Sequence, residues 1–201
     1  MQETKSKSMQ RKIILASKSK QRKKLLKIIG LDFKIEKSNY IEDMTEKIPA
    51  QKLVQKLALG KAMAVAKKHK NAIIIGADSF VVLEKEFLGK PHTSQRAEKM
   101  LKKISGKKHK LITGIAIIDT KKNKVITDYE ITEVWFKKLT AKEIEEYIKT
   151  GEPLDKAGGY AIQKFGCLFI EKINGGYTNA VGLPVNKIYE YLLKLNVNIL
   201  A

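Results

Sequence analysis

Two short runs without a polar side chain constrain the fold more than any other feature of the sequence. They lie at residues 13–16 (Ile-Ile-Leu-Ala) and 72–76 (Ala-Ile-Ile-Ile-Gly). A strand that is apolar at every position has to be buried on both faces, which is typical of a sheet covered by helices on its two sides. The segments around both runs have apolar residues at helical spacing. The two runs therefore predict an α/β protein with a covered central sheet.

Periodicity and turn residues predict the remaining elements. Further strand patterns lie at 32–37, 80–83, 110–120, 124–137 and 167–172. The two longest flank Lys121-Lys122-Asn123, which indicates a hairpin. Helical patterns cover a segment that ends before Gly30 and segments 50–67, 93–104, 140–150 and 184–195, with Thr93 and Thr140 as the expected caps. Because βα units are combined with a hairpin, we expect a mixed central β-sheet flanked by helices.

The length and composition favour one globular domain. We expect a disordered, lysine-rich tail at 1–10 and a single domain at 11–201 of the 201-residue chain. No apolar run reaches the roughly eighteen residues that a membrane-spanning helix needs. The N-terminal segment has no apolar core of the kind found in secretory signals, and the one cysteine, Cys167, precludes an internal disulfide. We therefore expect a cytoplasmic protein without a membrane partner, and a buried Cys167.

The formal net charge of +19 raises nucleic acid as a partner, but the distribution of the charge argues against it. Arginine, which forms the usual forks to bases and phosphates, occurs only at Arg11, Arg22 and Arg96. The lysines are spread along the whole chain. The charge is better explained by a solvated surface that also attracts a polyanionic small molecule.

Segment 151–166 is a glycine-rich loop crowded with polar groups. Its Glu152 and Asp155 provide acceptors, Lys156 a cation and Gln163 an amide, which suits a polar phosphorylated ligand. Its glycines, Gly158 among them, let the backbone approach a ligand closely. An ordinary surface loop is the alternative interpretation.

Polar residues also lie where strand patterns meet helices or turns. Ser17, Ser19 and Arg22 lie at a strand-to-helix junction, where amides, hydroxyls and cations bind phosphate; simple helix capping is the alternative. Asp78 follows the apolar strand 72–76, and a carboxylate at a strand end can activate water, hold a divalent cation or merely cap a turn. Lys90 projects from a Leu-Gly-Lys-Pro turn as a point charge for phosphate, or is simply solvated.

A lysine and an acidic pair complete the set of candidates. Lys61 lies close to the apolar stripe of helix 50–67, either as a functional cation or as a snorkelling side chain. Glu42 and Asp43 form an acidic pair that could join Asp78 in a site for Mg²⁺ or Mn²⁺. The three histidines lack the spacing of a zinc site.

Six motifs, in order, resemble those of the Maf family of septum formation proteins across nearly the whole chain. The family's Leu-Ala-Ser-x-Ser-Pro-Arg-Arg resembles 15–22, its Gly-Ala-Asp-Thr resembles 76–79, and its Leu-Gly-Lys-Pro is identical at 88–91. Its Gly-x-x-His-x-x-x-Thr-Gly matches 106–114, its Gly-Glu-Pro-x-Asp-Lys-Ala-Gly-x-Tyr-x-Ile-Gln matches 151–163, and its Asn-x-Val-Gly-Leu-Pro matches 179–184. Each motif alone is weak, but six in order are specific.

The resemblance implies an inosine-triphosphatase-like fold and a hydrolase that converts nucleoside triphosphates to monophosphate and pyrophosphate with a divalent cation. It implies a cytoplasmic homodimer that removes unwanted nucleotides and is linked to inhibition of septum formation. By similarity, Asp78 is the general base, Asp43 or the neighbouring Glu42 supplies the acidic site, and the supporting loop includes Asn179. The phosphate-binding residues by similarity are Ser17, Arg22, Lys61, Lys90 and Lys156.

Positions 21, 79 and 163 are those that the family associates with base selection. Gln163 and the intact Asp-Lys-Ala-Gly segment resemble the dTTP/UTP branch, whereas Gln21 and Ser79 depart from the family's arginine and threonine. The predicted function is therefore a dTTP/UTP pyrophosphatase that could extend to modified pyrimidine nucleotides. The alternatives are a 7-methyl-GTP pyrophosphatase of the same family and a non-catalytic division regulator that binds protein or nucleic acid.

Overall fold

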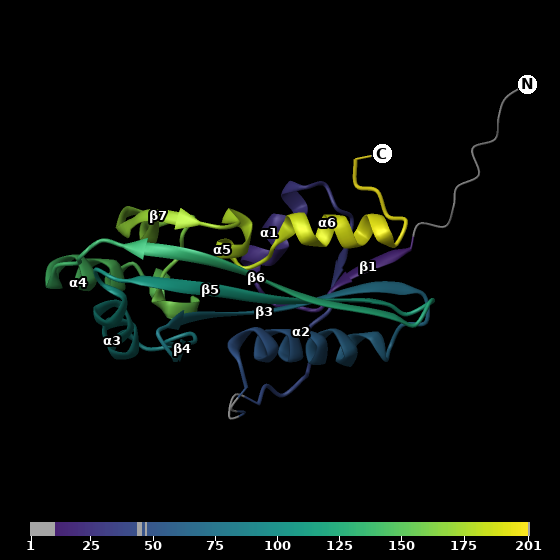
Figure 1. Ribbon diagram of the computed structural model, residues 1–201, viewed down its shortest axis with the longest axis horizontal. Coiled ribbons are helices and arrows are strands. Elements are labelled where there is room, and N and C mark those ends of the chain that lie inside the picture. The colour runs from purple at the N-terminus through teal and green to yellow at the C-terminus, as the bar shows by residue number, and fades with distance from the viewer. Residues whose placement is uncertain (1–10, 44–45, 47, 201) are drawn as a thin grey trace, which may run out of the picture.

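The computed structural model describes residues 11–43, 46 and 48–200, and its described strands form one mixed seven-stranded sheet (Figure 1). The strand order is β2-β1-β3-β5-β6-β7, and β4 pairs with β3. The strands are β1 (Lys12–Leu15), β2 (Lys34–Ile35), β3 (Ala72–Leu83), β4 (Glu86–Leu88), β5 (Lys108–Asp119), β6 (Lys124–Phe136) and β7 (Ile170–Asn174). β1 pairs in parallel with β2 and β3, and the other pairs are antiparallel, which confirms the expected mixed sheet.

Helices cover both faces of the sheet. They are α1 (Lys20–Ile28), α2 (Ala50–Ala66), α3 (Ser94–Ile104), α4 (Ala141–Lys149), α5 (Tyr177–Val181) and α6 (Val185–Lys194). In Figure 1, α2 lies on one face of the long strands, α1 and α6 lie on the other, and α3 and α4 gather at one end. The predicted caps are confirmed, since Thr93 accepts from the Arg96 amide and Thr140 forms a reciprocal capping box with Glu143. Among the described residues, no helix is both long and apolar enough to cross a membrane.

Alternating residues of β3 face different helices. Ile73, Ile75 and Ala77 belong to the core cluster that contains residues of α1 and α6, whereas Ile74 packs with α2. Because side chains alternate along a strand, Asp78 points to the α2 face and Ser79 to the α1 face. The helix on each face thus determines what each of these two polar residues can contact.

Close packing of α2 depends on two glycines in the sheet. A Cβ on Gly76 would lie 2.4 Å from the Ala58 carbonyl oxygen, and one on Gly114 would lie 2.3 Å from the Val54 carbonyl carbon. Neither helix backbone atom can move away without lifting α2. These glycines therefore set how closely α2 approaches Asp78, which pairs directly with Gly114.

We expect Gly114→Ala to lower the free energy of unfolding by about 2 to 3 kcal/mol, because the new methyl group overpacks the interface with α2. Denaturant unfolding would measure the loss. The matched control is Gly89→Ala, where a Cβ meets nothing within 4 Å. A Gly114→Ala protein as stable as the control would contradict this account of the packing.

Four details differ from the sequence predictions. The strand predicted at 32–37 is reduced to β2, Lys34–Ile35, because β1 offers only a short partner. The strands predicted at 72–76 and 80–83 are one continuous strand, so Asp78 lies within β3 and not at its end. The short elements β4 and α5 were not predicted. The strand predicted at 167–172 begins only at Ile170, after a short 3-10 helix at Phe165–Phe169.

The prediction that Cys167 is buried is wrong, because the structure leaves this residue exposed. Its neighbour Gly166 is buried, and the Gly166 amide donates to the carboxylate of Glu152 at 3.1 Å. This contact fixes the 3-10 helix with Phe169 inward and Cys167 outward. The predicted tail at 1–10 lies outside the described residues, and the single domain at 11–201 stays a prediction.

Candidate active site

Asp78 lies in a gap along one edge of β3. The parallel partner β1 ends opposite Ile75, and β4 begins opposite Val81. Both lie on the side of β3 away from β5, because β5 pairs with β3 at Ile75 and Val81 as well. The segment between them, residues 76–80, has no strand neighbour on this edge. Asp78 thus lies just beyond the point where the parallel strand β1 ends, as predicted for a carboxylate at a strand end. Its own strand, β3, continues past it.

The Asp78 carboxylate is buried, with 7% of the residue exposed. Its Oδ1 pairs with the Lys61 ammonium, while its Oδ2 accepts no hydrogen bond from the described part of the chain. Burial raises the pKa of Asp78, and the charges of Lys61 and Arg22 oppose that rise. A carboxylate with a raised pKa and a free oxygen is suited to accept a proton.

Lys61 joins two carboxylates rather than extending to solvent. It lies on the same side of α2 as the buried Leu57 and Ala58, and its ammonium contacts Asp78 and, at 2.8 Å, Glu42. Only 14% of its side chain is exposed. The charge at this position therefore belongs to the site, and the snorkelling alternative does not describe it.

The two acidic candidates at 42 and 43 have different neighbours. Glu42 reaches the site through Lys61, with 45% of its side chain exposed. Asp43 contributes, after Glu46, to the raised pKa of Lys56. The structure thus places Glu42 with Asp78 through Lys61, and Asp43 adjoins Glu42 in sequence.

Arg22 and Ser79 meet on the opposite face of β3. Arg22 is 9% exposed, and its guanidinium donates to Ser79 Oγ at 2.9 Å and to Ser17 Oγ at 3.3 Å. Ser79 Oγ also lies 2.9 Å from Thr113 Oγ1, whose hydroxyl donates to the Asn179 carbonyl at 3.4 Å. Four of the six sequence motifs thus contribute to one connected network around β3.

The glycine-rich loop packs beside the Lys90 turn. The Gly158 amide donates to the Gly89 carbonyl at 3.0 Å, and Gly158 has the left-handed φ of 70°. Although burial raises it, the pKa of Asp155 is lowered overall by an ion pair with Lys156 and by the charge of Lys90. The charges of Lys90 and Lys156 therefore both act on the Asp155 carboxylate.

Two further lysines, Lys18 and Lys37, were not among the sequence candidates. The pKa of Lys18 is lowered, first by the facing Lys37 ammonium, then by burial and by Lys90. Mutual repulsion of ammonium groups marks a place where an anion is stabilised. The sequence could have indicated them through the strand order, because each lysine follows the carboxyl end of one of the two parallel strands β1 and β2.

Of the other predicted site residues, two are buried and support the structure, and two lie in a turn and in a first helical turn. Glu152 is buried and accepts from the Tyr147 hydroxyl at 2.8 Å, so it anchors the loop from inside. Asn179 is fully buried and donates to Thr132 Oγ1 at 2.9 Å. Gln163 is half-buried in a turn of the loop. Gln21 lies in the first turn of α1, where its Oε1 accepts from the Ser19 hydroxyl at 3.3 Å.

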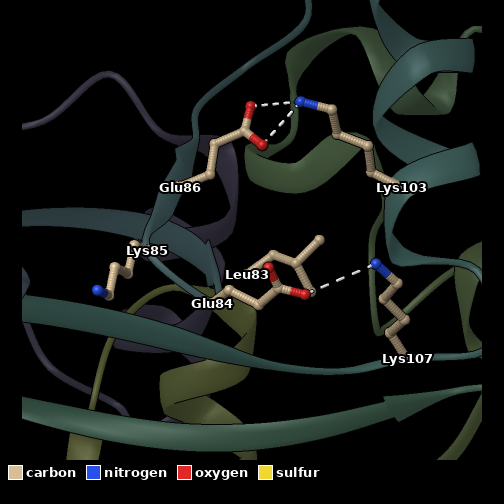
Figure 2. Close-up of a pocket in the computed structure, with 6 residues that line it drawn as sticks. All are labelled: Leu83, Glu84, Lys85, Glu86, Lys103 and Lys107. Carbon is tan, nitrogen blue, oxygen red and sulfur yellow. Dashed lines mark hydrogen bonds and ion pairs between the residues drawn. The ribbon is translucent and has the colours of Figure 1, made fainter.

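A hollow of about 600 Å³ elsewhere on the surface does not coincide with these residues. It lies at the turn between β3 and β4, where Figure 2 shows Glu86 facing Lys103 and Glu84 facing Lys107. These ion pairs satisfy four of the charged side chains that line it, and no buried carboxylate lies among its lining residues. Concavity alone therefore does not identify the site; the buried carboxylate and its cations do.

The fold and site define a class of α/β protein that presents a buried carboxylate and clustered cations to an anionic ligand. The family model of the Maf-like proteins matches residues 12–195, and the chain belongs to the Maf family. Members of this family that act as nucleotide pyrophosphatases are generally metal-dependent.

Named relatives agree with this assignment, and one solved structure shares the fold. A dTTP/UTP pyrophosphatase of Thermoanaerobacter sp. (strain X514) is 51% identical over 182 residues, which are 90% of this chain and 95% of the relative. A dTTP/UTP pyrophosphatase of Desulforamulus reducens is 45% identical over 94% of this chain and 99% of its own. The Ham1 protein of Staphylococcus aureus shares the fold, with a TM-score of 0.52 at 14% identity over 92% of this chain and 99% of its own.

Proposed function

We propose that the chain hydrolyses dTTP and UTP to the nucleoside monophosphate and pyrophosphate. The observation that supports this most strongly is the buried Asp78 carboxylate, with one oxygen held by Lys61 and the other free. Membership of the Maf family and relatives named dTTP/UTP pyrophosphatase supply the substrate class. Thymine and uracil, the bases of dTTP and UTP, have the same hydrogen-bonding groups at N3–H and O4.

In the proposed mechanism, Asp78 Oδ2 takes a proton from water, and the water oxygen forms a bond to phosphorus at the α–β bridge. The bridging P–O bond breaks, so the monophosphate and pyrophosphate separate. Lys61 keeps Asp78 ionised and oriented. Lys18, Lys37, Lys90 and Lys156 neutralise the polyphosphate charge, and the Ser17 hydroxyl donates a hydrogen bond to a phosphate oxygen. Phosphoryl transfer depends mostly on such positioning and electrostatics, which explains a site rich in lysine.

We propose that Asp78 and Glu42, with Asp43 adjoining them, hold a divalent cation, Mg²⁺ or Mn²⁺, together with substrate phosphates. The Asp78 and Glu42 carboxylates, which Lys61 brings together, fit a cation of this kind, which protein sites usually bind through one or two carboxylates. No group of three or more acidic, histidine or cysteine side chains suited to a metal occurs among the described residues. The site therefore fits a cation that arrives with the nucleotide, where it would neutralise phosphate charge.

Removal of divalent cations is expected to abolish pyrophosphate release, since the cation that Glu42 and Asp78 would hold would neutralise the phosphate charge. The measurement is the initial rate after treatment with a chelator, followed by titration with Mg²⁺ and Mn²⁺ separately. Recovery should saturate with either ion. Full activity in the presence of excess chelator would contradict the metal proposal.

We also propose that Gln21, Ser79 and Gln163 take part in base selection. The half-buried Gln163 amide can both accept and donate, which matches the N3–H and O4 edge of thymine and uracil. The test is a rate panel with dTTP, UTP, CTP, GTP and 7-methyl-GTP, for the wild type and Gln163→Glu. We expect the wild type to prefer dTTP and UTP by at least about tenfold, and the variant to lose that preference.

The panel separates the alternatives. A preference for 7-methyl-GTP would assign the chain to another branch of the family. If a folded sample releases no pyrophosphate from any nucleotide, a non-catalytic role in division is favoured.

We also propose that the chain forms a homodimer in the cytoplasm, as the resemblance to the Maf family implies. Its proposed cellular roles are removal of unwanted nucleotides and inhibition of septum formation. Phe165 and Leu168 beside the glycine-rich loop are exposed, at 59% and 67%, and suit burial against a second copy. Molar mass by light scattering tests the dimer: a monomer at micromolar concentration would exclude it.

A further inference from the structure

The inference concerns Arg22, whose guanidinium is committed to protein oxygens. Nε donates to the Gly182 carbonyl at 2.8 Å, one Nη donates to the Ala77 carbonyl at 2.7 Å and to Ser17 Oγ, and the other donates to Ser79 Oγ at 2.9 Å. Four of the five guanidinium N–H groups are thereby used. Movement to a substrate phosphate would leave the buried Ala77 carbonyl and the part-buried Gly182 carbonyl without this donor.

Two of these acceptors flank Asp78 directly. The Ala77 carbonyl belongs to the peptide bond that leads into Asp78, and Ser79 is the next residue. Both lie in segment 76–80, where β3 has no strand neighbour on the β1 edge. Arg22 occupies the place that a continued β1 would fill, and its guanidinium satisfies the Ala77 carbonyl as a neighbouring strand would.

The position of Arg22 is itself well fixed. Ser19 caps α1 by accepting from the Arg22 amide at 3.4 Å, which sets the residue in the first turn of the helix. Gly182, with φ of 120°, adopts a backbone conformation that other residues rarely take, and its carbonyl accepts from Arg22 Nε. Arg22 thus connects the start of α1, the end of α5 and the centre of β3.

We propose that Arg22 is a positioning residue that holds segment 77–79 in place so that the Asp78 carboxylate stays aimed at the substrate, and that it does not bind a phosphate. This inference rests on the proposed function for its kinetic readout. It revises the role that the resemblance implies for Arg22, while Ser17, Lys90 and Lys156 remain candidates for the phosphates.

The kinetic test compares Arg22→Lys and Arg22→Gln with wild type on dTTP. Displacement of the base by a fraction of an ångström should lower kcat by about 10- to 100-fold. KM should change by less than about threefold, because no ground-state contact to substrate is lost.

Two controls accompany these variants. Arg96→Gln, at an exposed arginine of α3, should leave both kinetic constants unchanged. Ser79→Ala removes a single Arg22 contact and should lower kcat in the same direction, which preserves the test if Arg22→Gln does not fold. A tenfold or larger rise in KM with kcat retained in Arg22→Lys would overturn the proposal and make Arg22 a phosphate ligand.

Amide hydrogen exchange gives a readout that needs no turnover. In Arg22→Lys, we expect exchange to accelerate at 76–80 but not in the hairpin of β5 and β6. Uniform acceleration, or none, would overturn the positioning role. Absence of pyrophosphate release from the wild type would overturn the proposed function instead, so the two failures are distinguishable.

Discussion

Replacement of Asp78 by asparagine is expected to lower kcat for pyrophosphate release by about a thousandfold, within the usual contribution of a general base. Asparagine keeps the shape of the side chain but cannot take a proton from water. Initial rates on dTTP at saturating substrate measure the effect. The matched control is Asp32→Asn, at an exposed aspartate away from the site. A variant with more than about a tenth of the wild-type kcat would exclude Asp78 as the base.

The same substitution should not destabilise the fold. Burial raises the pKa of Asp78 in the folded protein, so the folded state holds the proton more tightly than the unfolded state does. That contribution to stability is complete below the ordinary aspartate pKa and is lost as the pH rises through the raised value. Above the raised pKa, the ionised carboxylate therefore costs stability, and asparagine removes this cost. We expect a free energy of unfolding equal to or above that of the wild type.

Lys61→Met is expected to produce the second largest effect, a fall in kcat of about a hundredfold. Methionine fills a similar volume but leaves Asp78 and Glu42 without the cation that joins them. Because the charge of Lys61 lowers the pKa of Asp78, its removal should raise that pKa further. The base would then be protonated, and inactive, up to a higher pH.

The pH dependence of kcat/KM measures this shift, since it reports the ionisation of the free enzyme. We expect the acid limb of the wild type to lie above the ordinary aspartate range, and that of Lys61→Met higher still. Lys52→Met, at an exposed position of the same helix, should leave the limb in place. An unchanged limb in Lys61→Met would mean that Lys61 does not control Asp78.

Most of the secondary structure could be predicted from the sequence, because its determinants are local. The helical stripe of α2, the cap at Thr93, the capping box at Thr140 and the hairpin of β5 and β6 depend on residues a few positions apart. Predictions failed where a distant partner decides. β3 continues past Asp78 because β5 pairs with it along its whole length, and Cys167 is exposed because Glu152 fixes its neighbour Gly166.

The sequence by itself determined which residue types can do the chemistry: a carboxylate after an apolar strand, a lysine on an apolar helix and a glycine-rich loop with charged groups. Only the tertiary structure decided how they are used. Lys61 meets Asp78 because Gly76 and Gly114 let α2 lie close to the sheet. Arg22 meets Ala77 because β1 ends at Leu15 and a short connection leads into α1 at Lys20. Such contacts join segments far apart in the chain, and the alternation of side chains along β3 assigns Asp78 to one face and Ser79 to the other.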